Sequence, residues 1–302
     1  MKTKTMAVAS LLALSVSAPT FAATNEASAN QSTSESKSFL QGLKDSPLSL
    51  YAELESSTDF GLTEYKGSKL DTAFSYKLSD NTKLKSNLRL RVNNSNEDFE
   101  TSFDHGYLGY SKSKLLTEEK NGLNATGQVR FYKYNETASA EGGAQFRLYL
   151  DRKFSNKLSS AGVVIYEEKI KSKEDETQRY VYLEGGPTYN VNKKFDLGST
   201  VTFYQGYKKA STDTEASISL DPSYSINDKL SVKNVVAFSG SFGDSSKYAL
   251  SVTPSVSYSM NDDLSATLEY EANALRMVDG KIDGRQWGNN GELALNLAYS
   301  AF

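Results

Sequence analysis

The sequence predicts an all-β fold, a transmembrane antiparallel up-and-down β-barrel of about fourteen strands. Three observations lead to this prediction. Polar and apolar residues alternate along runs of ten to thirteen residues, a tyrosine-containing turn motif recurs every 34 to 38 residues, and the chain begins like an exported protein. Alternation with a period of two is typical of a strand that has one apolar and one polar face.

The composition excludes several other classes of protein. With 38% hydrophobic residues and a mean hydropathy of −0.52, the 302-residue chain has no apolar surplus for a helical membrane protein. The 34 basic and 37 acidic residues include no long basic run, so nucleic acid is not expected as a partner. The lack of cysteine excludes disulfides, thiolate metal sites and cysteine nucleophiles.

Residues 1–22 are predicted to be a secretory signal peptide. Lys2 and Lys4 give a basic start, and an apolar stretch of small residues follows that is too short to span a membrane as a helix. Ala22 favours cleavage after it, and loss of the two lysines takes the formal charge from −3 to −5. The next segment, 23–46, is polar and without periodicity, so we expect a polar periplasmic tether that precedes a barrel over 47–302.

The alternation is clearest between Lys247 and Met260. Every second residue there is apolar, a tyrosine or a proline, and the residues between them are lysine, serine, threonine or alanine. Similar runs cover 195–203, 216–226 and 264–274. These runs exceed the five or six residues usual in soluble strands and match the length needed for a tilted strand to cross a bilayer.

A repeated turn motif sets the strand count. Five copies place an apolar or aromatic marker residue at spacings of 76, 37, 35 and 34 residues; the markers are Leu78, Phe154, Val191, Ile226 and Met260. The first gap is twice the others, which predicts one more turn near residues 112–122. Six turns between hairpin units, with a strand at either end, give fourteen strands, an even number that allows closure. Twelve or sixteen strands remain open.

We expect the strands in chain order near 47–56, 69–79, 83–92, 101–112, 123–134, 143–154, 158–168, 179–191, 194–206, 215–226, 229–239, 247–260, 264–275 and 292–302. In the fourth strand the outward set is either Phe103, His105 and Tyr107 or Leu108 and Tyr110. In the seventh, Val163 and Ile165 break the alternation.

Three prolines fall inside the expected strands: Pro187, Pro222 and Pro254. Each removes a ladder hydrogen bond, so we expect a bulge near each.

The connections are asymmetric, with short tyrosine-containing turns at one end and longer polar loops at the other. Five tyrosines fall in one register at the short-turn end and are predicted to form an aromatic girdle at the membrane interface: Tyr76, Tyr189, Tyr224, Tyr258 and Tyr299. The longest loop, 276–291, contains the only tryptophan, Trp287, and is a candidate gate; residues 23–46 are a candidate plug.

The chain combines a predicted signal peptide, regularly spaced hairpins, an aromatic girdle and an alternating last strand that ends in Phe302. In these features it resembles the Gram-negative outer-membrane β-barrel porins. Its expected strand number resembles that of the monomeric fourteen-stranded porins. The resemblance implies that Phe302 is the C-terminal insertion signal, although Tyr299 is out of phase with it. It also implies an outer-membrane location, contact with outer-membrane lipid and lipopolysaccharide, insertion by the barrel-assembly machinery, and a monomer or trimer.

A fourteen-stranded barrel is too wide for side chains alone to fill, so its lumen is expected to hold water. Inward positions predict a basic wall, formed by Lys83, Lys85, Arg89, Arg91, Arg130, Arg147 and Lys153, facing an acidic wall, formed by Glu53, Glu55, Glu269, Glu271 and Glu292. Opposed walls make a transverse field that favours polar solutes. Inward tyrosines would either form a sugar-stacking track or merely fill space: Tyr51, Tyr132, Tyr149, Tyr182 and Tyr204.

The predicted function is therefore passive diffusion of small hydrophilic solutes and ions; the alternative is a structural, adhesion or receptor barrel with a narrow or closed lumen. No enzyme, cofactor or metal site is expected. The only histidine, His105, follows Asp104, and the two side chains of adjacent strand residues should point to opposite faces.

Overall fold

The computed structural model describes residues 47–59, 65–95, 98–135, 138, 140–173, 176–209, 211–242, 247–279, 281–284 and 291–301. These residues belong to one unit, Pro47–Phe302. The predicted signal peptide, the tether, Trp287 and Phe302 lie outside the described residues.

The unit consists almost entirely of strands. Fourteen of them form the wall: β1 (Leu48–Asp59), β2 (Tyr65–Ser79), β3 (Thr82–Ser95), β4 (Asp98–Leu116), β5 (Asn124–Tyr134), β6 (Gly142–Lys153), β7 (Leu158–Ile170), β8 (Arg179–Asn190), β9 (Phe195–Tyr207), β10 (Thr212–Ser225), β11 (Leu230–Phe242), β12 (Lys247–Ser259), β13 (Leu264–Val278) and β15 (Glu292–Ala301).

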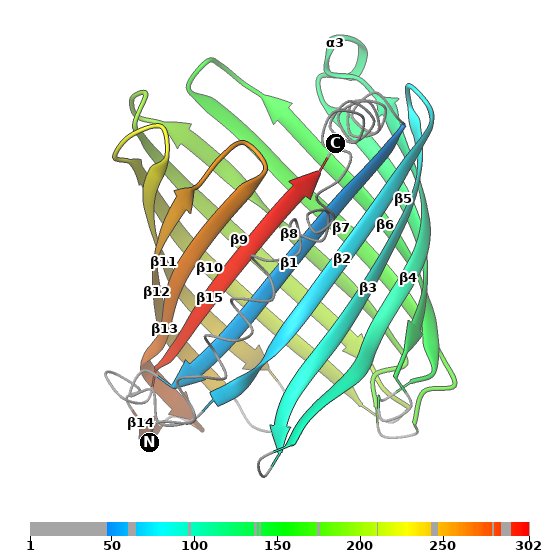
Figure 1. The fold of residues 1–302 in the computed structure, drawn as a ribbon, viewed down its shortest axis with the longest axis vertical. Coiled ribbons are helices and arrows are strands. Elements are labelled where there is room, and N and C mark those ends of the chain that lie inside the picture. Colours follow the sequence, from blue (N-terminus) through cyan, green and yellow to red (C-terminus); the bar gives the residue numbers. More distant parts are fainter. Residues whose placement is uncertain are drawn as a thin grey trace, which may run out of the picture. The chain divides into compact units, whose positions relative to one another are not determined.

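Each strand pairs with its neighbours in the chain, all antiparallel, and β15 closes the ring by pairing with both β13 and β1. Figure 1 shows the resulting barrel of tilted strands. Closure satisfies every edge, as lipid surroundings require, because unpaired amides in hydrocarbon cost several kcal/mol each. The all-β, fourteen-stranded barrel predicted from the alternation is confirmed.

Two connections differ from the expectation. A short strand, β14 (Lys281–Gly284), pairs with the outer end of β13, so part of the loop predicted over 276–291 is a hairpin. The turn expected near 112–122 contains α3 (Glu118–Asn121), which ends at Gly122 with a φ of 74°. Among the described residues no helix is long and apolar enough to cross a membrane.

Four of the five repeated turns share one hydrogen-bond pattern, which explains their motif. In the turn after β10, the Oδ1 atom of Asn227 accepts hydrogen bonds from the backbone N–H groups of Lys229 and Leu230, both at 2.9 Å. Asn192 and Asn261 do the same in their turns, and Ser155 does so through its hydroxyl in the weaker copy. A side chain that caps its own turn mimics a backbone turn and needs no support from elsewhere.

The ambiguity in the fourth strand is resolved by a bulge at Asp104. Arg89 lies opposite His105 and Leu90 lies opposite Phe103, so Asp104 has no partner of its own on β3. The extra residue shifts the alternation by one, as bulges do. Phe103, Leu108 and Tyr110 therefore all face outward. The outward residues thus come from both of the sets that the sequence offered for this strand.

No bulge accompanies Pro187 or Pro222, and the one register shift between β12 and β13 lies between Leu250 and Ser251, before Pro254. At Pro187 the pairing of β8 with β9 skips from Gly185 to Thr188, yet the register on either side is the same. Pro222 and Pro254 interrupt their ladders in the same way. Because proline lacks an N–H, pairing is lost only toward the following strand. The ladder to the preceding strand is kept at all three.

Candidate functional site

The lumen face follows from the register, since residues opposite each other on neighbouring strands share a face of the sheet. The large apolar side chains lie on the other face and are well exposed, as a lipid-facing surface is. By this criterion all twelve predicted wall residues point inward: the basic ones on β3, β5 and β6, the acidic ones on β1, β13 and β15.

The strand order places the two charged sets unevenly around the ring. Six strands separate β6 from β13 in either direction, so Arg147 and Lys153 lie half a turn from Glu269 and Glu271. The cations of β3, in contrast, are separated from Glu53 and Glu55 only by β2. Part of the basic set thus faces the acidic set and part of it adjoins that set.

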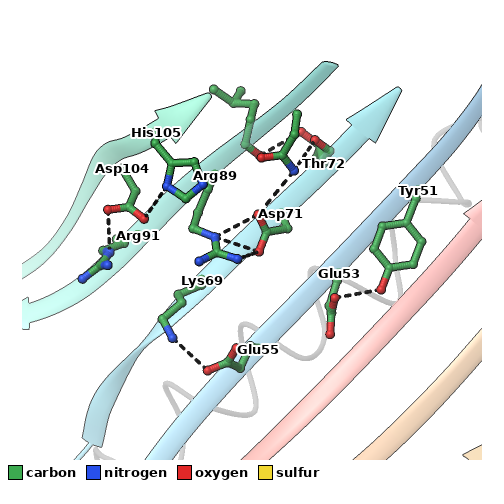
Figure 2. A network of polar contacts seen from close by, with 12 residues as sticks. Tyr51, Glu53, Glu55, Lys69, Asp71, Thr72, Arg89, Arg91, Asp104 and His105 are labelled. Carbon is green, nitrogen blue, oxygen red and sulfur yellow. Dashed lines mark hydrogen bonds and ion pairs between the residues drawn. The ribbon is translucent and has the colours of Figure 1, made fainter. Parts of the chain in front are cut away.

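Three of the cations next to the acidic strands, Lys69, Arg89 and Arg91, are paired with carboxylates (Figure 2). Two nitrogens of Arg89 bond Asp71, with Nη2 at 2.7 Å from Oδ2 and Nε at 2.9 Å. Arg91 Nε lies 2.9 Å from Asp104 Oδ1, and Lys69 Nζ lies 3.0 Å from Glu55 Oε1. Sequence patterns did not single out Lys69 and Asp71, because these two inward residues of β2 carry opposite charges and so belong to neither a basic nor an acidic wall.

The bulge changes the interpretation of His105. The prediction that Asp104 and His105 point to opposite faces is wrong, because the extra residue turns both into the lumen, where His105 Nδ1 lies 3.1 Å from Asp104 Oδ2. The carboxylate therefore holds both His105 and Arg91. In the described part of the chain His105 makes no other hydrogen bond, so no serine is joined to this pair as a nucleophile would be.

The inward tyrosines do not form a single track. Tyr51 lies on β1 and donates to Glu53 at 2.7 Å, while Tyr182 on β8 donates to Glu184. The ring contacts instead join Tyr132 to Tyr107 and Tyr134, with centroids 5.2 Å and 5.6 Å apart, and Tyr180 to Tyr204 at 5.4 Å.

A carboxylate that the sequence analysis did not select organises these tyrosines. Glu167, only 2% exposed, accepts hydrogen bonds from Tyr134 Oη at 2.6 Å, Tyr180 Oη at 2.8 Å and Gln145 Nε2 at 2.7 Å. A buried charge needs such partners. Ile165, 7% exposed, points inward beside this network, which explains why β7 breaks the expected alternation.

One side of the lumen is therefore lined by large, interlinked side chains, which we call the bulky wall. Its members on β5–β8 are Gln128, Arg130, Tyr132, Tyr134, Gln145, Arg147, Tyr149, Val163, Ile165, Glu167, Tyr180, Tyr182 and Glu184.

The adjoining side, which begins at β9 next to β8, is lined mostly by small residues, and we call it the smooth wall. Its members on β9–β12 are Thr200, Thr202, Ser217, Ser219, Asp221, Ala237, Ser239, Ala249, Ser251, Thr253 and Ser255. Thr202 and Ser217 hydrogen-bond at 2.6 Å, and Asp221 accepts from Thr200 and Ser219 at 3.1 Å and 3.0 Å.

The five tyrosines predicted for the girdle point outward near the short turns and are 43–47% exposed: Tyr76, Tyr189, Tyr224, Tyr258 and Tyr299. Tyr110 lies in the same row, since Leu84 is opposite both Tyr76 and Tyr110. The bulge at Asp104 shifts the alternation of β4, so sequence alternation alone did not assign Tyr110 to this row.

No family model and no curated protein sequence matches the chain. Its fold does match solved structures. A loop-deletion mutant of OmpT, an outer membrane protein of Vibrio cholerae, has 11% identity and a TM-score of 0.52 over 84% of this chain and 98% of that one. The outer membrane channel DcaP of Acinetobacter baumannii has 11% identity and a TM-score of 0.49 over 84% of this chain and 96% of that one. An anion-selective porin from Comamonas acidovorans has 11% identity and a TM-score of 0.49 over 84% of this chain and 98% of that one.

At such identities the likeness concerns the fold alone. The chain has the β-barrel architecture of outer-membrane porins and channels.

Proposed function

We propose that the protein is an outer-membrane porin that forms a water-filled channel for passive diffusion of small hydrophilic solutes and ions. One observation carries the proposal: a closed ring of fourteen strands presents polar residues inward, and across β9–β12 most of these residues are small. Such a ring is too wide to be filled by one bulky wall, which leaves the smooth wall in contact with water.

The same architecture supports the proposed location. The apolar outer face and the tyrosine row suit a bilayer, and the predicted signal peptide provides export to a Gram-negative outer membrane, with the barrel-assembly machinery and lipopolysaccharide as partners. Insertion as a monomer or trimer is compatible with the barrel. Passive diffusion requires no catalytic residue, cofactor or metal.

The planar lipid bilayer is the direct test. Refolded protein should give stable steps of open-channel current with a weak preference for cations, because the processed chain carries a formal charge of −5. Silent bilayers would instead favour the alternative, a structural, adhesion or receptor barrel with a narrow or closed lumen. Blocking of the current by sugars, amino acids or phosphates would then rank the solutes.

The charged walls can be tested in the same recordings. Replacing Arg89, Arg91 and Arg130 by serine should raise cation selectivity and shift the reversal potential in a salt gradient, since three positive charges leave the lumen. Unchanged reversal potentials would remove the proposed field.

The direction of the outer face needs its own test. The chain has no cysteine, so in the single variants Leu250→Cys and Leu268→Cys the introduced thiol is the only one that a thiol reagent can label. In liposomes a water-soluble maleimide should leave both unlabelled, whereas Ser251→Cys on the smooth wall should react. Rapid aqueous labelling of Leu268→Cys would contradict the membrane orientation.

A further inference from the structure

Two arginines of the bulky wall share the same neutral acceptors. Arg130 Nη1 lies 3.1 Å from Tyr132 Oη, and Arg147 Nη2 lies 3.5 Å from the same oxygen. Tyr149 Oη likewise accepts from Arg130 Nη2 at 3.4 Å and from Arg147 Nη1 at 3.2 Å. The two guanidinium groups are thus held side by side by phenol oxygens that carry no charge.

A third cation is held close to this pair by the absence of a side chain. Gly109 lies between Lys85 and Arg130 in the register, so no side chain separates them. A Cβ at Gly109 would come 3.3 Å from Arg130 Cγ and 2.9 Å from the Val129 carbonyl oxygen. Arg130 extends over this gap, with its guanidinium 4.3 Å from the ring centre of Tyr107.

These cations have no carboxylate partner within the described part of the chain. Lys83, Lys85, Arg130 and Arg147 make no ion pair there, unlike Arg89 and Arg91 on the same face. The nearby carboxylate of Glu167 is occupied by Tyr134, Tyr180 and Gln145. Like charges gathered without a paired counter-charge repel one another.

Two hydrogen-bond donors at the same place are also unused. Gln128 is 3% exposed, and its Oε1 accepts from Arg130 Nη2 at 2.9 Å, which leaves its Nε2 without a partner. Arg130 Nε is buried and unpartnered as well. Buried donors without acceptors are uncommon in folded proteins and call for an explanation. Excess positive charge and unpartnered donors together favour binding of an anionic acceptor.

We propose that Arg130 and Arg147, with Lys85 beside them, form a binding site for solutes that carry an oxyanion, a carboxylate or a phosphate. Arginine forks bind the oxygens of either group through parallel hydrogen bonds, and both arginines are partly exposed residues on the lumen face. The proposal rests on the proposed channel, since the lumen is the route by which solutes arrive. Its consequence is a local site for anions inside a pore of net negative charge.

The test uses the refolded full chain in detergent, where binding does not depend on conduction. Phosphorus NMR line broadening of inorganic phosphate measures the first ligand, and competition by acetate and citrate separates phosphate from carboxylate recognition. The double variant Arg130→Gln/Arg147→Gln should weaken phosphate binding at least about 10-fold, because charge-assisted hydrogen bonds are lost. Lys233→Gln on β11 removes one inward charge far from the site and should change binding by less than about 2-fold.

Variants of milder effect keep the test decisive if the double variant does not fold. Heat-dependent gel mobility checks folding, Lys85→Gln should weaken binding several-fold, and Arg147→Lys should retain part of it, since lysine keeps the charge but not the fork. Phosphate and acetate that fail to bind the folded wild type, or that bind Lys85→Gln and Arg147→Lys as tightly as wild type, would overturn the site even if bilayers conduct. Binding in detergent with silent bilayers would instead refute the channel and leave the site standing.

Discussion

The bulky wall and the smooth wall are built on the same strand geometry but differ in how their inward side chains are held. On β5–β8, tyrosine, arginine and glutamine side chains bond one another across strands around Glu167. On β9–β12 the inward residues are mainly serine, threonine and alanine, with short local bonds such as the one between Thr202 and Ser217. The difference teaches that two adjoining parts of one barrel wall can be held in different ways, one by a network of large side chains and the other by short local bonds.

The largest expected effect comes from making the smooth wall bulky. Ser219 and Ser251 lie at one level, on either side of Ala237, so the double variant Ser219→Trp/Ser251→Trp adds two large rings to the lumen. We expect single-channel conductance to fall by about half or more, since conductance follows the free cross-section. Leu220→Trp on the outer face is the control and should conduct normally. Equal conductance of wild type and double variant would show that the path lies elsewhere.

The next effect should come from the centre of the bulky wall. Glu167→Ala leaves Tyr134, Tyr180 and Gln145 without their acceptor, and we expect the free energy of unfolding to fall by about 3 kcal/mol. Urea titration in lipid vesicles followed by tryptophan fluorescence measures it. A loss below about 1 kcal/mol would mean that water replaces Glu167 readily, which would contradict a tightly held wall.

The matched change on the smooth wall should cost less. Asp221→Ala removes an acceptor for Thr200 and Ser219, but it is partly exposed and both hydroxyls can turn to lumen water, so we expect a loss of about 1 kcal/mol. The same urea titration applies. If Asp221→Ala cost as much as Glu167→Ala, the two walls would not differ in rigidity.

The smallest effect is expected at a single hydroxyl pair. Ser217→Ala deletes the bond to Thr202 and should lower the free energy of unfolding by about 0.5 kcal/mol without changing conductance. A drop above about 2 kcal/mol would indicate that the smooth wall contains a cooperative network after all.

Most of the fold could be predicted from the sequence because the alternation of the strands and the positions of the turn motifs agreed with each other. In β12 the alternation from Tyr248 to Tyr258 is unbroken, and the asparagine turns fix where such strands end. The bulge at Asp104 could not be predicted, because one extra residue leaves two alternations that are equally regular on either side. The prolines show the reverse case. Pro187 and Pro222 each lack a backbone N–H, but neither strand gains an extra residue, so the register stays the same on both sides.

The candidate site was predicted less completely. The inward direction of Arg130 and Arg147 follows from alternation, but their unbalanced charge depends on which carboxylates reach which cations. Asp71 reaches Arg89 directly across β2 and β3, and Asp104 reaches Arg91 only because of the bulge. Glu167 is engaged by tyrosines and not by an arginine. Such choices arise from side-chain packing across several strands, which strand periodicity does not encode.

The self-capped turns make each hairpin a module. Asn192, Asn227 and Asn261 each close their own connection with bonds made inside it, so each turn supplies its own cap. Duplication or loss of one such module changes the ring by two strands and keeps every remaining pair antiparallel. A lineage of barrels built in this way can grow or shrink its bore by whole hairpins while its joints stay the same.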